Sequence, residues 1–233
     1  MNNLPQGWEW RPLSALVKAE KPIVYGIVQA GPNYPGGIPY IKSSDVGSKI
    51  EVATLSLTSP SIAARYKRSM VRPGDIVFSL RGNIGELSIV PNELPEANLT
   101  QGTARIAVNG KAFNEFVAFA LRSPQLQQRI AIVGKGSTFR EISLEELRKL
   151  EIPLPPIPEQ RKIAEILKTW DEAIEKFEAL QNNKRKYFSW FRTDLLSGKR
   201  RLPGASGKWQ EVPLSEVLVE HKLVIVPRLR KLT

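Results

Sequence analysis

Cations, amides and hydroxyls in several segments of the chain are of the types that read double-stranded DNA. A DNA-reading surface needs Lys or Arg for the phosphates and fork-shaped or amide side chains for the base edges, displayed on loops that reach a groove. Arg81 carries the fork that guanine binds, and Asn83 carries the amide that adenine binds. The candidates are Lys42, Ser43, Ser44, Arg65, Lys67, Arg68, Arg81, Asn83, Gln101, Thr103, Lys135, Ser137, Thr138 and Arg140.

Each candidate also has a structural reading that the sequence leaves open. Arg81 could pair with Asp75 or Glu86, and Asn83 could fill a turn between two glycines. The pair Ser137 and Thr138 could simply begin a folded segment. Base contacts concentrate in a few side chains of each DNA-binding module, so we expect only some of these residues to read bases.

Residues for catalysis are not found in a working arrangement. There is no cysteine, and the single histidine, His221, is too isolated for a metal cluster or a catalytic triad. Residues 134–138 are similar to a phosphate loop, but the earlier glycine that such a loop requires would fall at Arg129. The glycine-rich loop and catalytic tetrad of a methyltransferase are also missing. We therefore expect no enzyme activity, no metal and no cofactor.

The charge balance favours a polyanionic partner. Lys and Arg number 34 against 23 Asp and Glu, which gives a net charge of +11. Such an excess suits nucleic acid or an anionic membrane surface, although many basic proteins merely have solvated lysine faces. The excess is most local between Arg65 and Arg81, where five cations face one acid, Asp75. No stretch approaches the roughly 18 uninterrupted apolar residues of a membrane span, so the expected location is the cytoplasm.

The elements that position these residues are predicted from turn signals and caps. Residues 20–110 are rich in Gly, Pro, Val and Ile, and the runs 23–28, 75–80 and 87–90 predict strands of a β-rich domain. Helices are expected over 113–122 and from Ser123–Pro124 to Gly134. A capping box predicts a short helix after Ser143. Four prolines over residues 153–158 predict a stiff connector that closes the domain.

A long helix follows from residue 158 to about residue 197, which contain no glycine and only the first proline. About 38 residues at about 1.5 Å each form a rod near 57 Å, too long for this domain to cover. Packing on its own domain is the alternative, but the length favours a partner helix. Its apolar candidates are Ile163, Ile166, Trp170, Ile174, Phe177, Leu180, Tyr187 and Phe191. The fold class is thus α+β, a β-rich globular domain followed by a long α-helix that packs as an antiparallel coiled coil.

An internal repeat indicates how the chain is organised. The sequence that begins at Trp8 and contains Pro12, Leu13 and Ser14 reappears 201 residues later, at residues 209–215. The chain thus resembles one complete unit followed by the opening of a second. We predict a globular domain at residues 1–157, a long helix at 158–198, and the start of a second, truncated unit at 199–233.

Together these segments resemble the specificity subunits of type I restriction-modification systems, over essentially the whole chain. The motifs that carry the resemblance are Leu4-Pro5 with Gly7-Trp8 and Pro12-Leu13, residues 37–41 with Asp45-Val46, residues 71–77, Gly82 with Gly85, residues 136–142, and residues 147–163. The last of these, prolines leading into a Glu-Gln helix start, is the most specific. The order and spacing of the motifs support the resemblance more than any one of them.

The resemblance implies a non-catalytic reader of a few base pairs, with a helix that acts as a ruler. It also implies docking onto modification subunits that hold the methyl-transfer chemistry, and through them onto restriction subunits. A full-length subunit has two recognition domains, so this half-length chain is expected to form a homodimer that reads a bipartite site. The alternative is a regulatory competitor that occupies the modification subunits without reading DNA.

Overall fold

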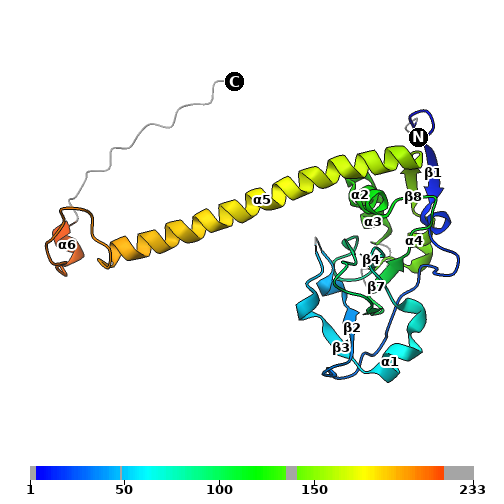
Figure 1. The fold of residues 1–233 in the computed structure, drawn as a ribbon, viewed down its shortest axis with the longest axis horizontal. Helices are drawn as coiled ribbons and strands as arrows, with labels where there is room; N and C mark the ends of the chain where they lie inside the picture. Colours follow the sequence, from blue (N-terminus) through cyan, green and yellow to red (C-terminus); the bar gives the residue numbers. More distant parts are fainter. Residues whose placement is uncertain (1–3, 48, 135–140, 218–233) are drawn as a thin grey trace. The chain divides into compact units, whose positions relative to one another are not determined.

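The computed structural model describes residues 4–47, 49–134 and 141–217, and the chain forms two compact units, Met1–Glu172 and Ala173–Thr233. The first unit holds all the described strands and every short helix except α6, and α5 continues from it into the second unit (Figure 1). The fold therefore mixes strands and helices and has a long helix toward the C-terminus, as predicted.

A three-stranded antiparallel sheet lies at the centre of the first unit. Its order is β5 (Leu87–Ile89), β4 (Ile76–Ser79) and β7 (Thr103–Ile106), so the predicted strands at 75–80 and 87–90 are confirmed. Every residue of β4 is buried, because the strand is covered on both faces. Ile76 and Phe78 face one hydrophobic core, and Val77 faces the other.

The predicted strand at residues 23–28 is wrong. Tyr25 bridges Ala104, but two residues later Ile27 bridges Thr100, so the segment changes its partner before a ladder can form. Gly26 passes directly against the backbone of Leu99, where a Cβ atom would overlap the carbonyl group. The β-branched composition of the run therefore favours extended chain, but it does not supply the partner that a strand needs.

A second sheet has the order β3 (Ser56–Thr58), β2 (Ile38–Ile41) and β6 (Asn98–Leu99). β2 pairs antiparallel with β3 and parallel with β6. Ile41 and Leu99 are buried in the second core, beside Val77 of the central sheet. Short helical turns flank these strands, namely η2 (Ser43–Asp45), η3 (Val52–Thr54), α1 (Pro60–Arg65) and η4 (Lys67–Ser69).

The two ends of the first unit meet in a small antiparallel sheet of β1 (Glu9–Pro12) and β8 (Glu151–Leu154), drawn side by side in Figure 1. This sheet corrects the prediction that residues 153–158 form only a connector. Pro153 lies within β8 opposite Trp10, where a strand of a two-stranded sheet tolerates its missing N–H. Pro158 lies in the first turn of the following helix, where an N–H has no helical partner.

Three short helices cover the first core, and the predicted caps are confirmed. They are α2 (Asn114–Arg122), α3 (Pro124–Val133) and α4 (Leu144–Lys149). The Ser123 hydroxyl accepts from the N–H of Leu126 at the start of α3, and Gly134 caps its C-terminus. Ser143 and Glu146 form the predicted capping box of α4.

The long helix α5 spans Ile157–Leu196, which agrees with the predicted limits. Its 40 residues make a rod of about 60 Å. The helix is anchored at its start by Gln160, which is fully buried. The Gln160 Oε1 atom accepts from the N–H of Phe113 (2.8 Å), and its Nε2 atom donates to the carbonyl of Pro155 (2.7 Å). Gly198 lies just beyond its end with φ of 72°, as a C-terminal cap requires.

Each copy of the internal repeat places a short helical segment after its proline, but in different surroundings. In the first copy, η1 (Leu13–Leu16) follows Pro12, and Leu13 is fully buried. In the second, α6 (Leu214–Val217) follows Pro213, and Leu214 is 71% exposed. The predicted domain limits and the coiled-coil packing of α5 remain predictions.

Candidate nucleic-acid interface

The first predicted loop follows β2 and is held by its own polar groups. The N–H of Lys42 donates to Asp45 Oδ2 (2.8 Å), which closes the η2 turn. The Lys42 Nζ atom donates to the Ser56 hydroxyl (2.9 Å), and the Ser43 hydroxyl donates to the carbonyl of Gly102 (2.9 Å). Ser44 is exposed. Lys42 and Ser43 therefore fix the loop, and the exposed Ser44 donates its hydroxyl to Asp45 Oδ1 (3.3 Å).

The second predicted loop leaves β4 and turns sharply before β5. Gly82 and Gly85 have φ of 71° and 90°, a conformation that favours glycine. The N–H of Glu86 donates to the carbonyl of Asn83 (3.1 Å), so Asn83 does occupy a turn between glycines. Its side chain is nevertheless exposed, which keeps it available for a partner.

Arg81 pairs with neither of the two acids that the sequence suggested. Its Nε atom forms an ion pair with Glu141, and the backbones of Arg81 and Glu141 form an isolated β-bridge. The Arg81 side chain remains 46% exposed. Asp75 is instead buried and accepts from the N–H of Arg72 (3.0 Å). Because Arg81 and Glu141 lie far apart in the sequence, local patterns did not reveal this pair.

Hydrogen bonds bring these loops together with a third segment. The N–H of Leu80 donates to the carbonyl of Gly102 (2.8 Å), the same residue that Ser43 bonds. The N–H of Ile142 donates to the carbonyl of Leu80 (3.1 Å). Arg81, Gln101 and Glu141 consequently line one cavity of about 370 Å³. Segments near residues 43, 81, 101 and 141 thus meet on one rim.

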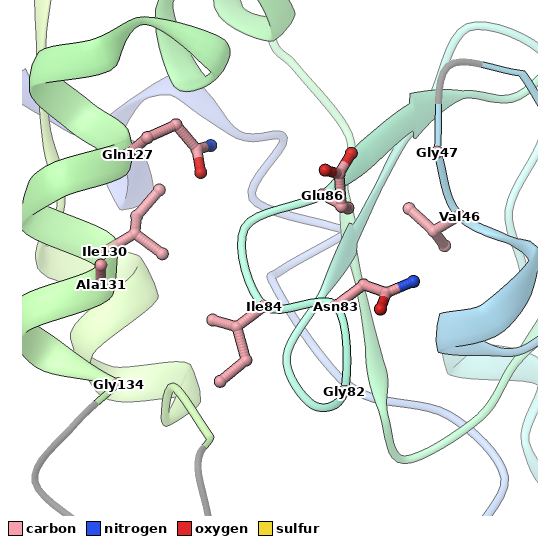
Figure 2. Close-up of a pocket in the computed structure, with 10 residues that line it drawn as sticks. All are labelled: Val46, Gly47, Gly82, Asn83, Ile84, Glu86, Gln127, Ile130, Ala131 and Gly134. Atoms are coloured by element: carbon pink, nitrogen blue, oxygen red, sulfur yellow. The ribbon is translucent and has the colours of Figure 1, made fainter. Parts of the chain in front are cut away.

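A second cleft, of about 670 Å³, lies between this rim and α3 (Figure 2). Gln127 and Ile130 point from α3 toward the 82–86 turn, while Asn83 points toward Val46 on the other side. Gln127 holds the turn in place, because its Nε2 atom donates to the carbonyl of Gly85 (3.0 Å). Glu86 also lines the cleft. Sequence reasoning considered Glu86 only as a partner of Arg81 and did not identify Gln127.

Cations gather on α1 and η4, where Arg65, Lys67 and Arg68 are all exposed. The turn that carries them is held by Asn98 of β6, whose Nδ2 atom donates to the carbonyls of Ala63 (3.4 Å) and Tyr66 (3.3 Å). Exposed cations on a fixed turn suit phosphates, which are bound without reading a base. No ion pair found within residues 4–47, 49–134 and 141–217 neutralises them.

Thr103 must be removed from the predicted surface residues. It is fully buried in β7, and its hydroxyl lies 3.2 Å from the carbonyls of both Ile41 and Thr100. Its neighbour Arg105 is also buried and donates to the carbonyl of Met70 (2.6 Å). Burial lowers the pKa of the Arg105 guanidinium, and the nearby Asp75 carboxylate opposes that shift. Both residues hold the domain together from inside.

The third predicted loop, with Lys135, Ser137, Thr138 and Arg140, lies outside the described residues. Its flanks are described on both sides. Gly134 lines the larger cleft, and Glu141 pairs with Arg81. The roles given to these four residues therefore remain predictions.

The comparison with protein families decides the relationship of the chain. Residues 5–184 match the family model described as the type I restriction modification DNA specificity domain. The chain belongs to this family. The match contains the β-rich unit, both clefts and most of α5, so the resemblance that the sequence motifs indicated is confirmed.

Curated specificity subunits are similar over most of this chain. The EcoBI subunit of Escherichia coli is 30% identical over 178 residues, which are 74% of this chain and 37% of that subunit. The MjaVIII subunit of Methanocaldococcus jannaschii is 27% identical over 212 residues, 87% of this chain and 48% of that protein. The chain therefore spans less than half of the length of these relatives.

Solved structures agree in fold. The HsdS subunit of Thermoanaerobacter tengcongensis has a TM-score of 0.58 at 21% identity, covering 77% of this chain and 41% of that chain. A chain from a study of complex assembly in the type I R-M system has a TM-score of 0.60 at 20% identity, covering 82% and 45%. At this identity the likeness establishes the fold of the specificity domain.

The partner face predicted for α5 divides into a covered and an exposed part. Ile163 is partly buried and packs against the first core, and its place among the partner residues remains a prediction. From Ile166 onward the large apolar residues of the seam are exposed, Trp170 by 66% and Phe177 by 71%. The same holds for Ile174, Leu180, Tyr187 and Phe191.

Within the described part of the chain, no cluster of three or more His, Cys, Asp or Glu side chains could hold a metal ion. None of the described helices has an apolar stretch long enough to cross a membrane.

Proposed function

We propose that this chain is the DNA-recognition component of a type I restriction-modification complex and that exposed side chains on the rim formed near residues 43, 81 and 101 contact the bases. The observation that carries the proposal is the convergence of these segments from distant parts of the sequence. Hydrogen bonds and an ion pair fix them, so their exposed side chains have a defined geometry toward a groove. A preorganised set of donors and acceptors is what direct readout needs.

Different residues take different parts of the contact. Arg81 is suited to guanine and Asn83 to adenine, with Ser44 and Gln101 as further polar contacts beside them. The cluster of Arg65, Lys67 and Arg68 is suited to phosphates. Lys42 and Ser43 support the rim from within, because their polar groups are bonded to other parts of the domain.

Methyl transfer and cleavage are assigned to other subunits. The names of the relatives describe them as specificity subunits of restriction enzymes, and the similar solved structure concerns assembly of the type I system. By analogy, this non-catalytic chain docks onto modification subunits and through them onto restriction subunits. The relatives come from bacteria and an archaeon, which supports a prokaryotic cytoplasmic location.

Two copies of the chain pair through α5 in this proposal. The exposed aromatic seam beyond Ile163 supports it, since large apolar surfaces of this kind mark interaction sites. Two identical domains related by a twofold axis read the same bases twice. The target is then an interrupted palindrome whose gap is fixed by the helix, with residues 1–157 reading DNA and residues 158–198 as spacer.

Methylation by a reconstituted complex tests the proposal. The complex contains the modification subunits with this chain as the sole specificity subunit, and methylated positions are mapped on random DNA. Methylation confined to one interrupted palindrome is the expected result. Two other results together would identify the chain as a regulatory competitor instead. The reconstituted complex would show no sequence-specific methylation, and adding this chain to a complex with another specificity subunit would reduce the methylation by that complex.

A further inference from the structure

The apolar seam of α5 that is left for a partner begins at Ile166. The preceding seam residue, Ile163, packs against the core of its own domain, and Ala164 is buried there as well. The seam then continues through eight positions to Phe191. They are Ile166, Trp170, Ala173, Phe177, Leu180, Lys184, Tyr187 and Phe191.

The spacing of these eight positions is the same in both directions. The steps between them alternate four and three, and the first and last steps are both four. An antiparallel copy of the helix presents the same steps in reverse order. All eight positions of one copy can therefore lie level with all eight of the other, in one register only.

We propose that two copies pair α5 antiparallel in the register that places Ile166 of one copy level with Phe191 of the other. The proposal rests on the pairing proposed above and specifies its contacts. Each layer occurs twice about the twofold axis. The layers are Ile166 with Phe191, Trp170 with Tyr187, Ala173 with Lys184, and Phe177 with Leu180.

The one charged residue of the seam selects this register from its neighbours. Here Lys184 lies beside the small Ala173, so its aliphatic stem can pack while its ammonium group reaches water. A slip of one heptad in one direction would place Lys184 level with Ile166. Phe191 would then lie level with Glu159 and would be left exposed. A slip in the other would place Lys184 against Leu180. A single polar residue in a seam is a known means of fixing register.

The area of the seam is sufficient for a stable pair. The six large apolar members have exposed fractions between 44% and 71%. With about 200 Å² for a side chain of this size, they present on the order of 700 Å² per copy. A standard specific interface buries about 800 Å² per partner.

The positions that flank the seam match in the same register. Leu167 of one copy lies near Phe188 of the other, which widens the apolar contact. The flanking positions 167, 169, 174, 176, 181, 183, 188 and 190 hold one charge, Lys176, and it lies opposite Asn183. Like charges therefore do not face each other across the pair, so the flanks do not oppose the register.

Cysteine cross-linking of the full chain tests this register, because the natural sequence has no cysteine. In the double variant Ile166→Cys with Phe191→Cys, both positions are exposed, so the fold should be kept. Within one chain the two sites are about 37 Å apart along the helix, which excludes an internal disulfide. Under mild oxidation we expect most of the protein to run as a covalent dimer on a non-reducing gel.

Two control variants give the opposite expectation. Ile166→Cys alone should not cross-link, since its two copies lie about 37 Å apart across the twofold axis, whereas a parallel pair would join them. Ile166→Cys with Lys184→Cys should not cross-link either, and a disulfide there would demonstrate the slipped register.

Sedimentation of the unmodified chain separates the possible failures. If the unmodified chain is a dimer but the double variant Ile166→Cys with Phe191→Cys does not cross-link, the register is overturned and the pairing stands. A monomer at tens of micromolar would overturn the pairing itself. Neither result bears on DNA reading, which the methylation map measures independently.

Discussion

At the scale of single residues, Arg81 and Glu141 are the pair on which the proposed base reading depends most. The carboxylate holds the guanidinium through Nε, so the two Nη groups form the fork that guanine O6 and N7 accept. An arginine on an exposed loop otherwise samples many rotamers. In the proposed function Glu141 is therefore a positioning residue, which gives a reason for a negative charge on the rim.

Replacing Glu141 by Gln should lower sequence discrimination more than affinity. An exposed ion pair contributes at most about 1 kcal/mol, so we expect the preference for the favoured base at one position to fall by up to about fivefold. Binding to unrelated DNA should stay equal or rise slightly, because one negative charge is removed. Competition binding with single-base variants of the methylated site measures both quantities.

Glu145→Gln provides the matched control, since Glu145 pairs with Lys149 on α4 and both side chains are 73% exposed. It should leave discrimination unchanged. Equal effects of the two substitutions would show that Glu141 acts only through the total charge.

Gln160 illustrates a residue whose importance is structural. Its buried amide joins α5 to the carbonyl of Pro155 and the N–H of Phe113, so Gln160→Ala leaves both groups unsatisfied. Each buried unsatisfied group costs about 1–3 kcal/mol, so the two together should lower the unfolding temperature by roughly 5–20 °C. Thermal unfolding by circular dichroism checks this, with Lys162→Ala as the exposed control. Identical curves for the two variants would contradict the assignment.

At the scale of elements, the sequence predicted those whose signals are local. β4, β5, α2, α3, α4 and α5 follow from apolar runs, caps and helical spacing, and each was placed within one or two residues. The run at 23–28 failed because strand pairing depends on a partner elsewhere, and its partner changes between Tyr25 and Ile27. β1 and β8 were missed because prolines in β8 obscure its strand pattern.

The candidate site was predictable in its loops but not in its contacts. Turn glycines and cations indicated residues 42–44 and 81–83, while the Arg81–Glu141 pair and the contact of Ser43 with Gly102 join segments that are distant in the sequence. Thr103 was misplaced because a threonine suits a strand interior as well as a surface, and only the fold shows that it is buried.

Lys184→Leu should strengthen the proposed helix pair and loosen its register. A leucine removes the cost of partly burying a charge, so we expect the dimer dissociation constant to fall about tenfold or more. Pairs in a slipped register then no longer bury a lysine against a large apolar residue. Cysteines introduced at positions 166 and 191 should therefore cross-link in a smaller fraction of chains. Sedimentation and the oxidation assay measure these changes. Lys186→Leu, outside the seam, is the control, and a tighter dimer with Lys186→Leu but not Lys184→Leu would contradict the seam.

At the scale of the whole molecule, the net charge of +11 and the exposed cations on α1 and η4 predict electrostatic binding. The logarithm of affinity should fall linearly with the logarithm of salt concentration, since phosphate contacts release counterions. Arg68→Ala should reduce the slope by about one and weaken all DNA sequences about equally. Filter binding across a salt series measures this, and a slope that does not change would exclude Arg68 from the phosphate contacts.

The most direct test of the central claim is the methylation map of the reconstituted complex with Arg81→Ala in place of the natural chain. If the rim at residues 43, 81 and 101 reads bases, one position of each half-site should lose its preference while the remaining positions and the gap are kept. The Arg68→Ala complex should keep the full motif at lower activity. An Arg81→Ala complex that methylates the unchanged motif would contradict the account.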